Sequence, residues 1–229
     1  ICTALIPGKP APRILSEELV KLMRPGSIIY DLAAEQGGNS AYSEAGKINI
    51  VEGIKVIDAA SFIAGPSAAT IMSDYGAEVI KIEPQFGDSL RNLILNGRMP
   101  EGKENYCWEL TSRNKKSISL NLKDKKAHEI LVELIKDADV FITNMPFPIR
   151  KKLKITSQDI RPHNNKIIYA SLTGYGEVGP DADRTAYDSM AWWARSGLMD
   201  WVRPSDNSPV AWSTPGMGDH PTGMALYGA

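Results

Sequence analysis

Short apolar runs alternate with helical patterns along most of this 229-residue chain. The runs are nearly continuous in Val, Ile and Leu, which is typical of strands buried on both faces of a parallel sheet. A helix between two strands returns the chain to the same end of the sheet, so that the next strand can run parallel to the first. The alternation therefore predicts an α/β fold, a Rossmann-like open parallel sheet with flanking helices. Strands are expected at Ile54–Ile57, Glu78–Ile82, Ser117–Leu122, Val140–Thr143 and Lys166–Leu172.

The helices between these strands are expected where small or capping residues follow a strand. The first follows the turn Ala64-Gly65-Pro66 and ends near Tyr75-Gly76. An amphipathic pattern predicts a later helix over Tyr187–Ser196, ended by Gly197. Two more helices are expected over Lys125–Lys136 and near Ser157–Ile160.

The first fifty residues have a smaller pattern of their own. A strand (Ile1–Ile6), a helix from Ser16 to about Met23 and a second strand (Ser27–Leu32) predict a β-loop-α-β unit too small to fold alone. Ser16 is the expected N-cap. The run Gly37-Gly38-Asn39 is expected to form a turn.

The composition fits a soluble globular protein, with 43% hydrophobic and 23% charged residues. A net charge of −1 gives no field that would recruit nucleic acid or a membrane surface. Cys2 and Cys107 lie far apart without metal-ligand spacing, so reduced thiols in a cytoplasm are expected. The chain runs from Ile1 to Ala229 and stops just after a glycine-rich turn, so we expect a fragment of a longer protein.

A carboxylate stands among glycines near the end of the chain, in Gly216-Met217-Gly218-Asp219-His220-Pro221-Thr222-Gly223. Gly218 and Gly223 allow a backbone to approach a ligand closely, which makes Asp219 a candidate nucleophile. Taken alone, the pattern is also that of an ordinary turn.

A glycine-rich run, Gly174-Tyr175-Gly176-Glu177-Val178-Gly179, has the spacing of a dinucleotide-binding loop. That interpretation needs a helix to open at the last glycine. Pro180-Asp181-Ala182-Asp183 favours a turn instead, and its carboxylates would repel phosphates. The histidines are far apart and lack metal-ligand spacing, so no metal site is predicted; they are His128, His163 and His220.

Two basic clusters, one at Arg113-Asn114-Lys115-Lys116 and one at Lys151, Lys152 and Lys154, are either solvated faces or phosphate-binding groups. Tryptophans gather toward the end of the chain, where core packing and an apolar or aromatic acyl pocket both explain them. They are Trp192, Trp193, Trp201 and Trp212.

Residues 52–229 resemble class III CoA-transferases of the formyl-CoA transferase type, through a highly specific combination of motifs. Three motifs near the end of this chain look most similar to those of the anaerobe enzymes that move CoA between 2-hydroxyacyl and 2-enoyl acids in amino-acid fermentation. Those motifs are Thr185-Ala186-Tyr187-Asp188, Trp192–Gly197 and Gly218-Asp219-His220. The general motifs are Glu52–Asp58, Ala64-Gly65-Pro66, Gly76–Pro84 with Gly87-Asp88 and Arg91, Asn114–Ile118, Ala138–Asn144 and Thr173–Pro180.

The resemblance implies covalent chemistry in which Asp219 attacks the thioester to give a mixed anhydride and then an aspartyl-CoA thioester. It implies oxyanion contacts from Gly216, Gly218 and the Ile63-Ala64 loop. It places Asp188 near the reacting groups, and Tyr187 where related racemases carry a histidine base. It implies no metal and no permanently bound cofactor, with an acyl-CoA and a carboxylic acid as substrates in an interlocked homodimer. The implied CoA-binding residues are Ala64, Gly65, Glu83, Arg113, Asn114, Lys115, Asn144 and Lys152.

One stretch departs from the family pattern. The family's Asn-Phe-Arg-Pro-Gly is replaced here by Asn144-Met145-Pro146-Phe147-Pro148, which removes an arginine and adds prolines. The second half of the family fold is also not part of this sequence, so a complete active site is not expected from these residues alone.

Residues 1–51 resemble the NAD-binding part of the transhydrogenase α subunit and of alanine dehydrogenase. The family changes at Gly53–Ile57, a string that both share, so a joining of two genes is predicted. Two alternatives to CoA transfer stay open: an NAD-binding fragment, and a CoA-transferase remnant without activity. The motifs behind this resemblance are Thr3–Pro12, Lys21–Ser27 and Asp31–Asn39.

Overall fold

The computed structural model of the chain describes residues 1–23, 27–46, 53–93 and 102–229. They divide into two compact units, one of residues 1–54 with 75–77 and one of residues 55–74 with 78–229. The predicted domain boundary between residues 51 and 52 lies outside the described residues. Within the described ranges, no helix combines the length and the apolar character that crossing a bilayer requires.

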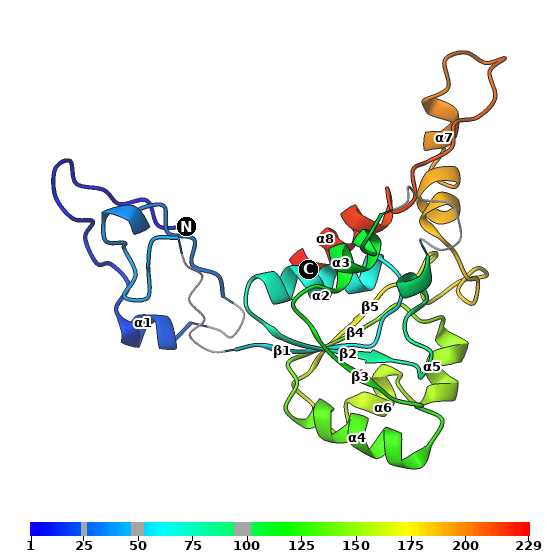
Figure 1. Ribbon diagram of the computed structural model, residues 1–229, viewed down its shortest axis with the longest axis horizontal. Helices are drawn as coiled ribbons and strands as arrows, with labels where there is room; N and C mark the ends of the chain where they lie inside the picture. The colour runs from blue at the N-terminus through cyan, green and yellow to red at the C-terminus, as the bar shows by residue number, and fades with distance from the viewer. Residues whose placement is uncertain (24–26, 47–52, 94–101) are drawn as a thin grey trace. The chain divides into compact units, whose positions relative to one another are not determined.

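The larger unit is built on a five-stranded sheet with the strand order β3-β2-β1-β4-β5 (Figure 1). All four strand pairings are parallel, which confirms the predicted Rossmann-like sheet. All five strands predicted for this unit are present, and the largest shift is at β3, which ends at Ser119 rather than Leu122. The strands are β1 (Lys55–Asp58), β2 (Glu78–Glu83), β3 (Lys116–Ser119), β4 (Val140–Thr143) and β5 (Ile168–Ser171).

Helices cover both faces of this sheet, with α2, α3 and α8 on one face and α4 and α6 on the other (Figure 1). The helix predicted over Tyr187–Ser196 is a π-helix over Ser189–Ala194, and Gly197 follows it with φ +83°. The helices are α2 (Ala64–Asp74), α3 (Tyr106–Ser112), α4 (Lys125–Lys136), α5 (Phe147–Leu153), α6 (Ser157–Ile160), α7 (Leu198–Trp201) and α8 (Asp219–Gly228), with a 3₁₀ turn at Ser89–Asn92.

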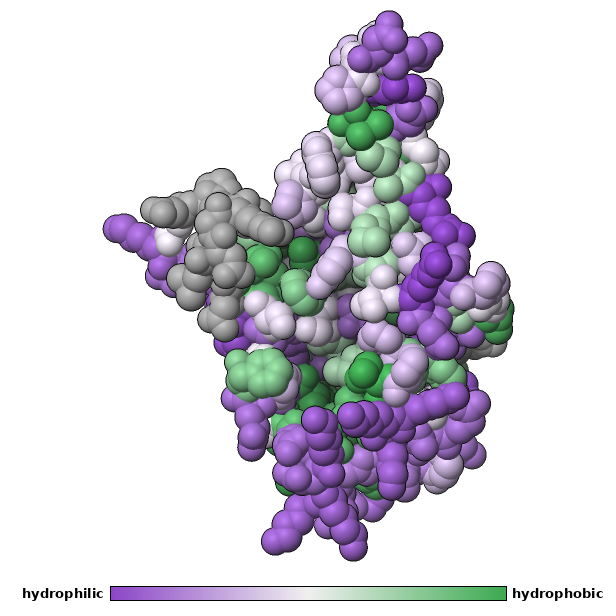
Figure 2. Space-filling model, turned by 90° about the vertical axis from the view of Figure 1, so that its right-hand side faces the viewer, coloured by the Kyte–Doolittle hydropathy of each residue, from purple (hydrophilic) through white to green (hydrophobic). Residues whose placement is uncertain are grey.

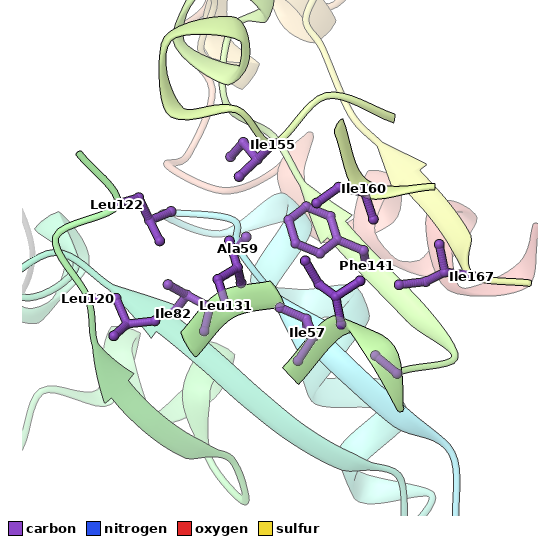
Figure 3. Close-up of a cluster of buried hydrophobic side chains, with 12 residues drawn as sticks. Ile57, Ala59, Ile82, Leu120, Leu122, Leu131, Phe141, Ile155, Ile160 and Ile167 are labelled. Carbon is purple, nitrogen blue, oxygen red and sulfur yellow. The ribbon is translucent and has the colours of Figure 1, made fainter. Parts of the chain in front are cut away.

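The hydrophobic core lies between the sheet and α4 (Figure 3). Leu131 and Ile135 of α4 are fully buried in the cluster that contains Ile57 of β1 and Phe141 of β4. The ring of Phe141 stacks on Tyr169 with 5.6 Å between centroids. This packing fixes the two central strands, and with them the positions at which their carboxyl ends leave the sheet.

The smaller unit corrects the β-loop-α-β prediction. Its helix is present as α1 (Glu17–Lys21), with Ser16 Oγ accepting from Leu19 N, and a 3₁₀ turn follows at Ala34–Gln36. The predicted strands are reduced to isolated bridges, of which one joins Cys2 and Asp31. Side chains satisfy the backbone in place of a ladder. Asn39, for example, accepts from Ala4 N at 2.9 Å and donates to Ala4 O at 2.9 Å.

Candidate active site

The loop after β1, residues 59–63, lies at the point where the strand order reverses between β1 and β4. In open α/β sheets, ligands bind outside the carboxyl ends of the strands at such a point. Asn144, which follows β4, connects the end of that strand to the loop after β1. Its Nδ2 donates to Ser61 O at 2.7 Å and its Oδ1 accepts from Ser61 N at 2.9 Å. Asn144 thus fixes the loop that leads into Ala64 and Gly65 at the buried start of α2.

In the first basic cluster, predicted to be either a solvated face or a phosphate-binding group, the Lys115 side chain is turned into the protein interior. That side chain is 2% exposed, and its Nζ lies 2.9 Å from Asp58 Oδ2. The same ammonium donates to Pro66 O at 2.7 Å and to Thr111 O at 2.8 Å. A lysine ammonium has three hydrogens to donate, and all three have acceptors inside the protein. Lys115 therefore joins α2, α3 and β1, while its neighbour Lys116 is exposed and pairs with Glu78.

The Glu83 side chain is also buried and binds other groups of the protein. Its carboxylate accepts from Arg91 Nε at 2.7 Å and Nη2 at 2.6 Å, from Ser117 Oγ and from Asp88 N. Burial alone would raise the pKa of Glu83, but these hydrogen bonds lower it to about 2. Its side chain therefore orders the end of β2, and a contact between Glu83 and CoA stays a prediction.

The other predicted CoA contacts lie on exposed positions. Lys152 is an exposed residue in the last turn of α5. Arg113 is exposed and forms a two-point pair with Asp74. Asn114 has φ +58° and donates to Ser73 O at 2.7 Å. Pro146 and Pro148, which replace the family pattern, lie at the N-cap and in the first turn of α5, where proline is tolerated.

Asp219 is the first residue of α8, and its surroundings raise the pKa of its carboxyl group. Burial, together with the nearby carboxylate of Asp188, raises the pKa of Asp219 to about 6. Asp188 is held in place because its Oδ1 accepts from Ser189 N at 2.7 Å and its Oδ2 from Gly218 N at 3.2 Å. The structure therefore brings together Asp188, Gly218 and Asp219.

Glycines around Asp219 permit contacts that a side chain would prevent. A Cβ on Gly218 would lie 2.8 Å from Trp192 Cβ, and one on Gly223 would lie 2.8 Å from Ala64 O. Gly216 has φ +82°, and a Cβ there would lie 3.4 Å from Ile63 Cδ1. The start of α8 is therefore packed against both the π-helix and the loop after β1.

Aromatic side chains border the same region. The ring of Tyr187, which is 60% exposed, meets Phe62 edge to face at 5.8 Å. Trp192 stacks on Trp193 at 6.0 Å, and Trp193 Nε1 donates to Ala211 O. His220 is turned toward α2, where its Nδ1 lies 3.4 Å from Ser67 Oγ.

The glycine-rich run at 174–179 lacks the helix that dinucleotide binding needs. Gly176 and Gly179 have φ +89° and +99°, residues 180–183 form a turn, and the next helical segment of the described chain begins at Ser189. Glu177 instead accepts from Arg150 Nη1 at 2.6 Å and from Ser171 Oγ at 2.6 Å. This run is a structural turn beside β5.

Sequence reasoning missed the charged side chains beneath the loop after β1. Asp58, Lys81 and Asp88 are buried there together with Lys115. One signal for them exists, because Lys81 stands between two isoleucines in a strand of a parallel sheet. Its partners lie too far along the chain to be deduced from a local pattern.

Comparison with known proteins shows the family to which the chain belongs. The pattern described as CoA-transferase family III matches residues 51–229. The chain belongs to CoA-transferase family III. A second pattern, the C-terminal domain of alanine dehydrogenase and PNT, matches residues 1–72. Both predicted resemblances are thereby confirmed, and the two matches overlap at the start of the larger unit.

Relatives of known function match the larger unit. The chain is 40% identical over 178 residues to (R)-2-hydroxy-4-methylpentanoate CoA-transferase of Clostridioides difficile, covering 77% of this chain and 44% of the relative. It is 40% identical to cinnamoyl-CoA:phenyllactate CoA-transferase of Clostridium sporogenes, covering 78% and 43%. Human succinyl-CoA:glutarate CoA-transferase is also 40% identical, covering 82% and 42%. The chain thus spans less than half the length of the curated relatives it matches.

Solved structures agree with this assignment. A hypothetical protein of Mycobacterium tuberculosis is 29% identical with a TM-score of 0.67, covering 78% of this chain and 47% of its own. A CAIB/BAIF family protein of Brucella suis is 25% identical with a TM-score of 0.66, covering 79% and 49%. The fold of the larger unit is therefore that of the family.

Proposed function

We propose that this chain supplies the nucleophile and the CoA-binding half of an enzyme that transfers CoA between a 2-hydroxyacyl or enoyl thioester and a carboxylic acid. The observation that carries the proposal is Asp219, a partly buried carboxylate with a raised pKa at the start of α8. Glycines flank it, and the loop after β1 packs against its segment. Such a carboxylate ionises above about pH 6 and is poorly solvated, which favours nucleophilic attack.

The proposed reaction proceeds through two covalent intermediates on Asp219. A carboxylate oxygen attacks the thioester carbonyl, the C–S bond breaks, and a mixed anhydride forms while the CoA thiolate leaves. The thiolate then attacks the Asp219 carbonyl carbon, which releases the donor acid and leaves an aspartyl-CoA thioester. The acceptor carboxylate repeats both steps in the reverse order. It ends as the new acyl-CoA, and Asp219 is again a free carboxylate.

Backbone groups near Asp219 are suited to the oxyanions of these steps. Hydrogen-bond donors placed where negative charge develops stabilise the transition state most when water is excluded. We propose the amides of the Ile63-Ala64 loop as donors. A donor role for Gly216 N stays a prediction. Gly218 N, which was also predicted as a donor, already donates to Asp188 Oδ2, so in this arrangement it orients the acid beside the nucleophile.

The side chains around the site favour an apolar acyl group. Ile63 packs on Gly216, Trp192 packs on Gly218, and Phe62 pairs with Tyr187 next to Asp188. Aromatic and aliphatic walls of this kind bind branched or aromatic acyl groups better than a dicarboxylate. Two relatives named for 4-methylpentanoate and cinnamoyl substrates agree with this choice, although a third is named for glutarate. A role in amino-acid fermentation stays a prediction.

Trapping of the covalent intermediate tests the proposal. The full-length protein that contains this chain is incubated with cinnamoyl-CoA, hydroxylamine is added, and the peptide around Asp219 is mapped by mass spectrometry. We expect an aspartyl hydroxamate at Asp219, because hydroxylamine attacks anhydrides and thioesters. A protein that transfers CoA but gives no hydroxamate would rule out Asp219 as the nucleophile. Retention on immobilised NAD but not on CoA would favour the NAD-binding alternative instead.

We also propose that the active protein is a homodimer in which a second copy covers the segment around α7. Trp201 and Trp212 of this segment are 83% and 89% exposed, and the segment extends away from the sheet (Figure 1). Figure 2 shows hydrophobic residues between the segment and the hydrophilic lower edge of this face. Large exposed apolar side chains of this kind mark interaction surfaces. A Trp201→Ser, Trp212→Ser variant should lower the dimer fraction in light scattering, and a monomeric wild-type protein would contradict the proposal.

The cellular location is proposed to be the cytoplasm. Both cysteines, Cys2 and Cys107, are free, as expected for a reducing compartment.

A further inference from the structure

Four charged side chains lie buried together beneath the loop after β1, and the proposed transfer reaction uses none of them. Asp58, Lys81, Asp88 and Lys115 are each at most 2% exposed. Lys81 Nζ lies 3.1 Å from Asp88 Oδ2 and 3.7 Å from Asp58 Oδ2, which Lys115 Nζ approaches to 2.9 Å. The two positive and two negative charges balance. We call these four residues the buried quartet.

Three members of the buried quartet bind the backbone of the loop directly, and the fourth, Lys115, contacts Asp58. Lys81 Nζ donates to Ala60 O at 2.9 Å, and Asp58 Oδ1 accepts from Ala60 N at 3.2 Å. Asp88 Oδ1 accepts from Phe62 N at 3.3 Å. Since Asn144 holds Ser61, side chains fix three successive residues of this loop.

This loop needs such restraint. Phe62 has φ +64°, in the left-handed region that is strained for a non-glycine residue. Conformations of this kind persist only where the surroundings fix them, and they occur often at functional sites. The hydrogen bond from Phe62 N to Asp88 supplies part of that restraint.

The loop connects the buried quartet to the proposed nucleophile. Ile63, the residue after Phe62, packs against Gly216, three residues before Asp219. The ring of Phe62 meets Tyr187, which directly precedes Asp188. A shift of the loop would therefore move one wall of the site.

Stability alone does not account for the quartet. Replacing buried ion pairs by apolar side chains of similar volume is often neutral or stabilising, because desolvation opposes the attraction between the charges. We propose that Asp58, Lys81, Asp88 and Lys115 are positioning residues: they hold the loop 59–63 in the one conformation that places Ile63 against the nucleophile's segment. They do not contact the substrate. This inference rests on the proposed function.

Two double variants of the full-length protein test it as a matched pair. Both carry Lys81→Met, with Asp88→Leu in one and Asp88→Asn in the other, so neither leaves a net charge behind. Asparagine keeps an oxygen that accepts from Phe62 N, and leucine does not. The measurements are the rate of hydroxamate formation at Asp219 with cinnamoyl-CoA, the KM for that thioester, and amide hydrogen exchange of residues 59–63.

We expect the leucine variant to react about 10- to 100-fold more slowly, as misplacement of about 1 Å can cause, with the KM changed by less than about threefold. The asparagine variant keeps the acceptor for Phe62 N and loses only the contact from Lys81 to Ala60 O, so it should be slowed clearly less than the leucine variant, by no more than about fivefold. Exchange at Phe62 should be faster in the leucine variant only. Equal rates in the two variants, whether both fast or both slow, would overturn the proposal.

The wild-type protein separates this inference from the proposed function. If wild type gives no hydroxamate, the proposed function fails, while loop exchange still decides whether Asp88 holds Phe62. If neither double variant folds, exchange at Ala60 and Phe62 in wild type remains the test. Protection like that of β1 supports the restraint, and exchange at the rate of an open loop overturns it.

Discussion

Replacing Asp219 by asparagine is expected to lower the rate of CoA transfer by on the order of 10⁴-fold or more, as loss of a covalent nucleophile does. The amide has the size of the carboxylate, so packing at the start of α8 is preserved. It lacks the nucleophilic oxygen anion, so no anhydride forms. The KM for the acyl-CoA should change little, because the side chain acts in the reaction rather than in binding the CoA tail. Initial rates with cinnamoyl-CoA and a 2-hydroxy acid, in the full-length protein, measure this.

Asp183→Asn is the matched control for this substitution. Asp183 is an exposed carboxylate in the turn after the glycine-rich run, and the same chemical change there should leave the rate within about twofold, as at most surface positions. Asp219→Asn with more than about 1% of the wild-type rate would mean that the carboxylate is not the nucleophile. A thermal melt of each variant separates loss of chemistry from loss of folding.

The sheet was predictable because its signal is local. Each central strand is rich in β-branched or aromatic residues, as in Val140–Thr143, and each connection carries its own helical period. The prediction for α4 matches its bounds, Lys125–Lys136, because a strong alternation of apolar and charged residues begins after Asp124 and stops at the next strand. Such patterns need no knowledge of what lies across the fold.

The smaller unit was predicted less well because its structure depends on contacts that are not local. Ile1–Ile6 and Ser27–Leu32 have the composition of strands, but strands need partners that extend the ladder. Asp31 and Asn39 bind the backbone there, so the ladder is replaced by side-chain hydrogen bonds. The outcome depends on side-chain contacts between residues up to 35 positions apart.

The candidate site depends on both local sequence patterns and contacts between distant residues. The glycines around Asp219 were visible in the sequence, but only the family resemblance distinguished a nucleophile from a turn. The surroundings were not visible, because Asp188 meets Gly218 across 30 positions and Lys115 meets Asp58 across 57. A basic run near a strand predicts a surface, and the fold placed one of its lysines inside.

Lys115→Met is expected to lower the free energy of unfolding by about 3–5 kcal/mol, the range found when one member of a buried ion pair is removed. Methionine fills nearly the same volume but neutralises the charge that faces Asp58. Asp58 then keeps only Lys81, whose Nζ lies 3.7 Å away and is closer to Asp88. Pro66 O and Thr111 O also lose a donor while staying enclosed. Urea unfolding followed by tryptophan fluorescence and circular dichroism measures the loss.

Lys116→Met, the same change at the next residue, separates burial from charge. The Lys116 side chain is 72% exposed and pairs with Glu78 at the surface, so its loss should cost no more than about 1 kcal/mol. Equal, small losses in both variants would mean that Lys115 is solvated and free to meet a phosphate, as the sequence pattern suggested. A large loss only at Lys115 would instead mean that the lysine nearest to Asp58 is needed to build the site, whichever residues bind CoA.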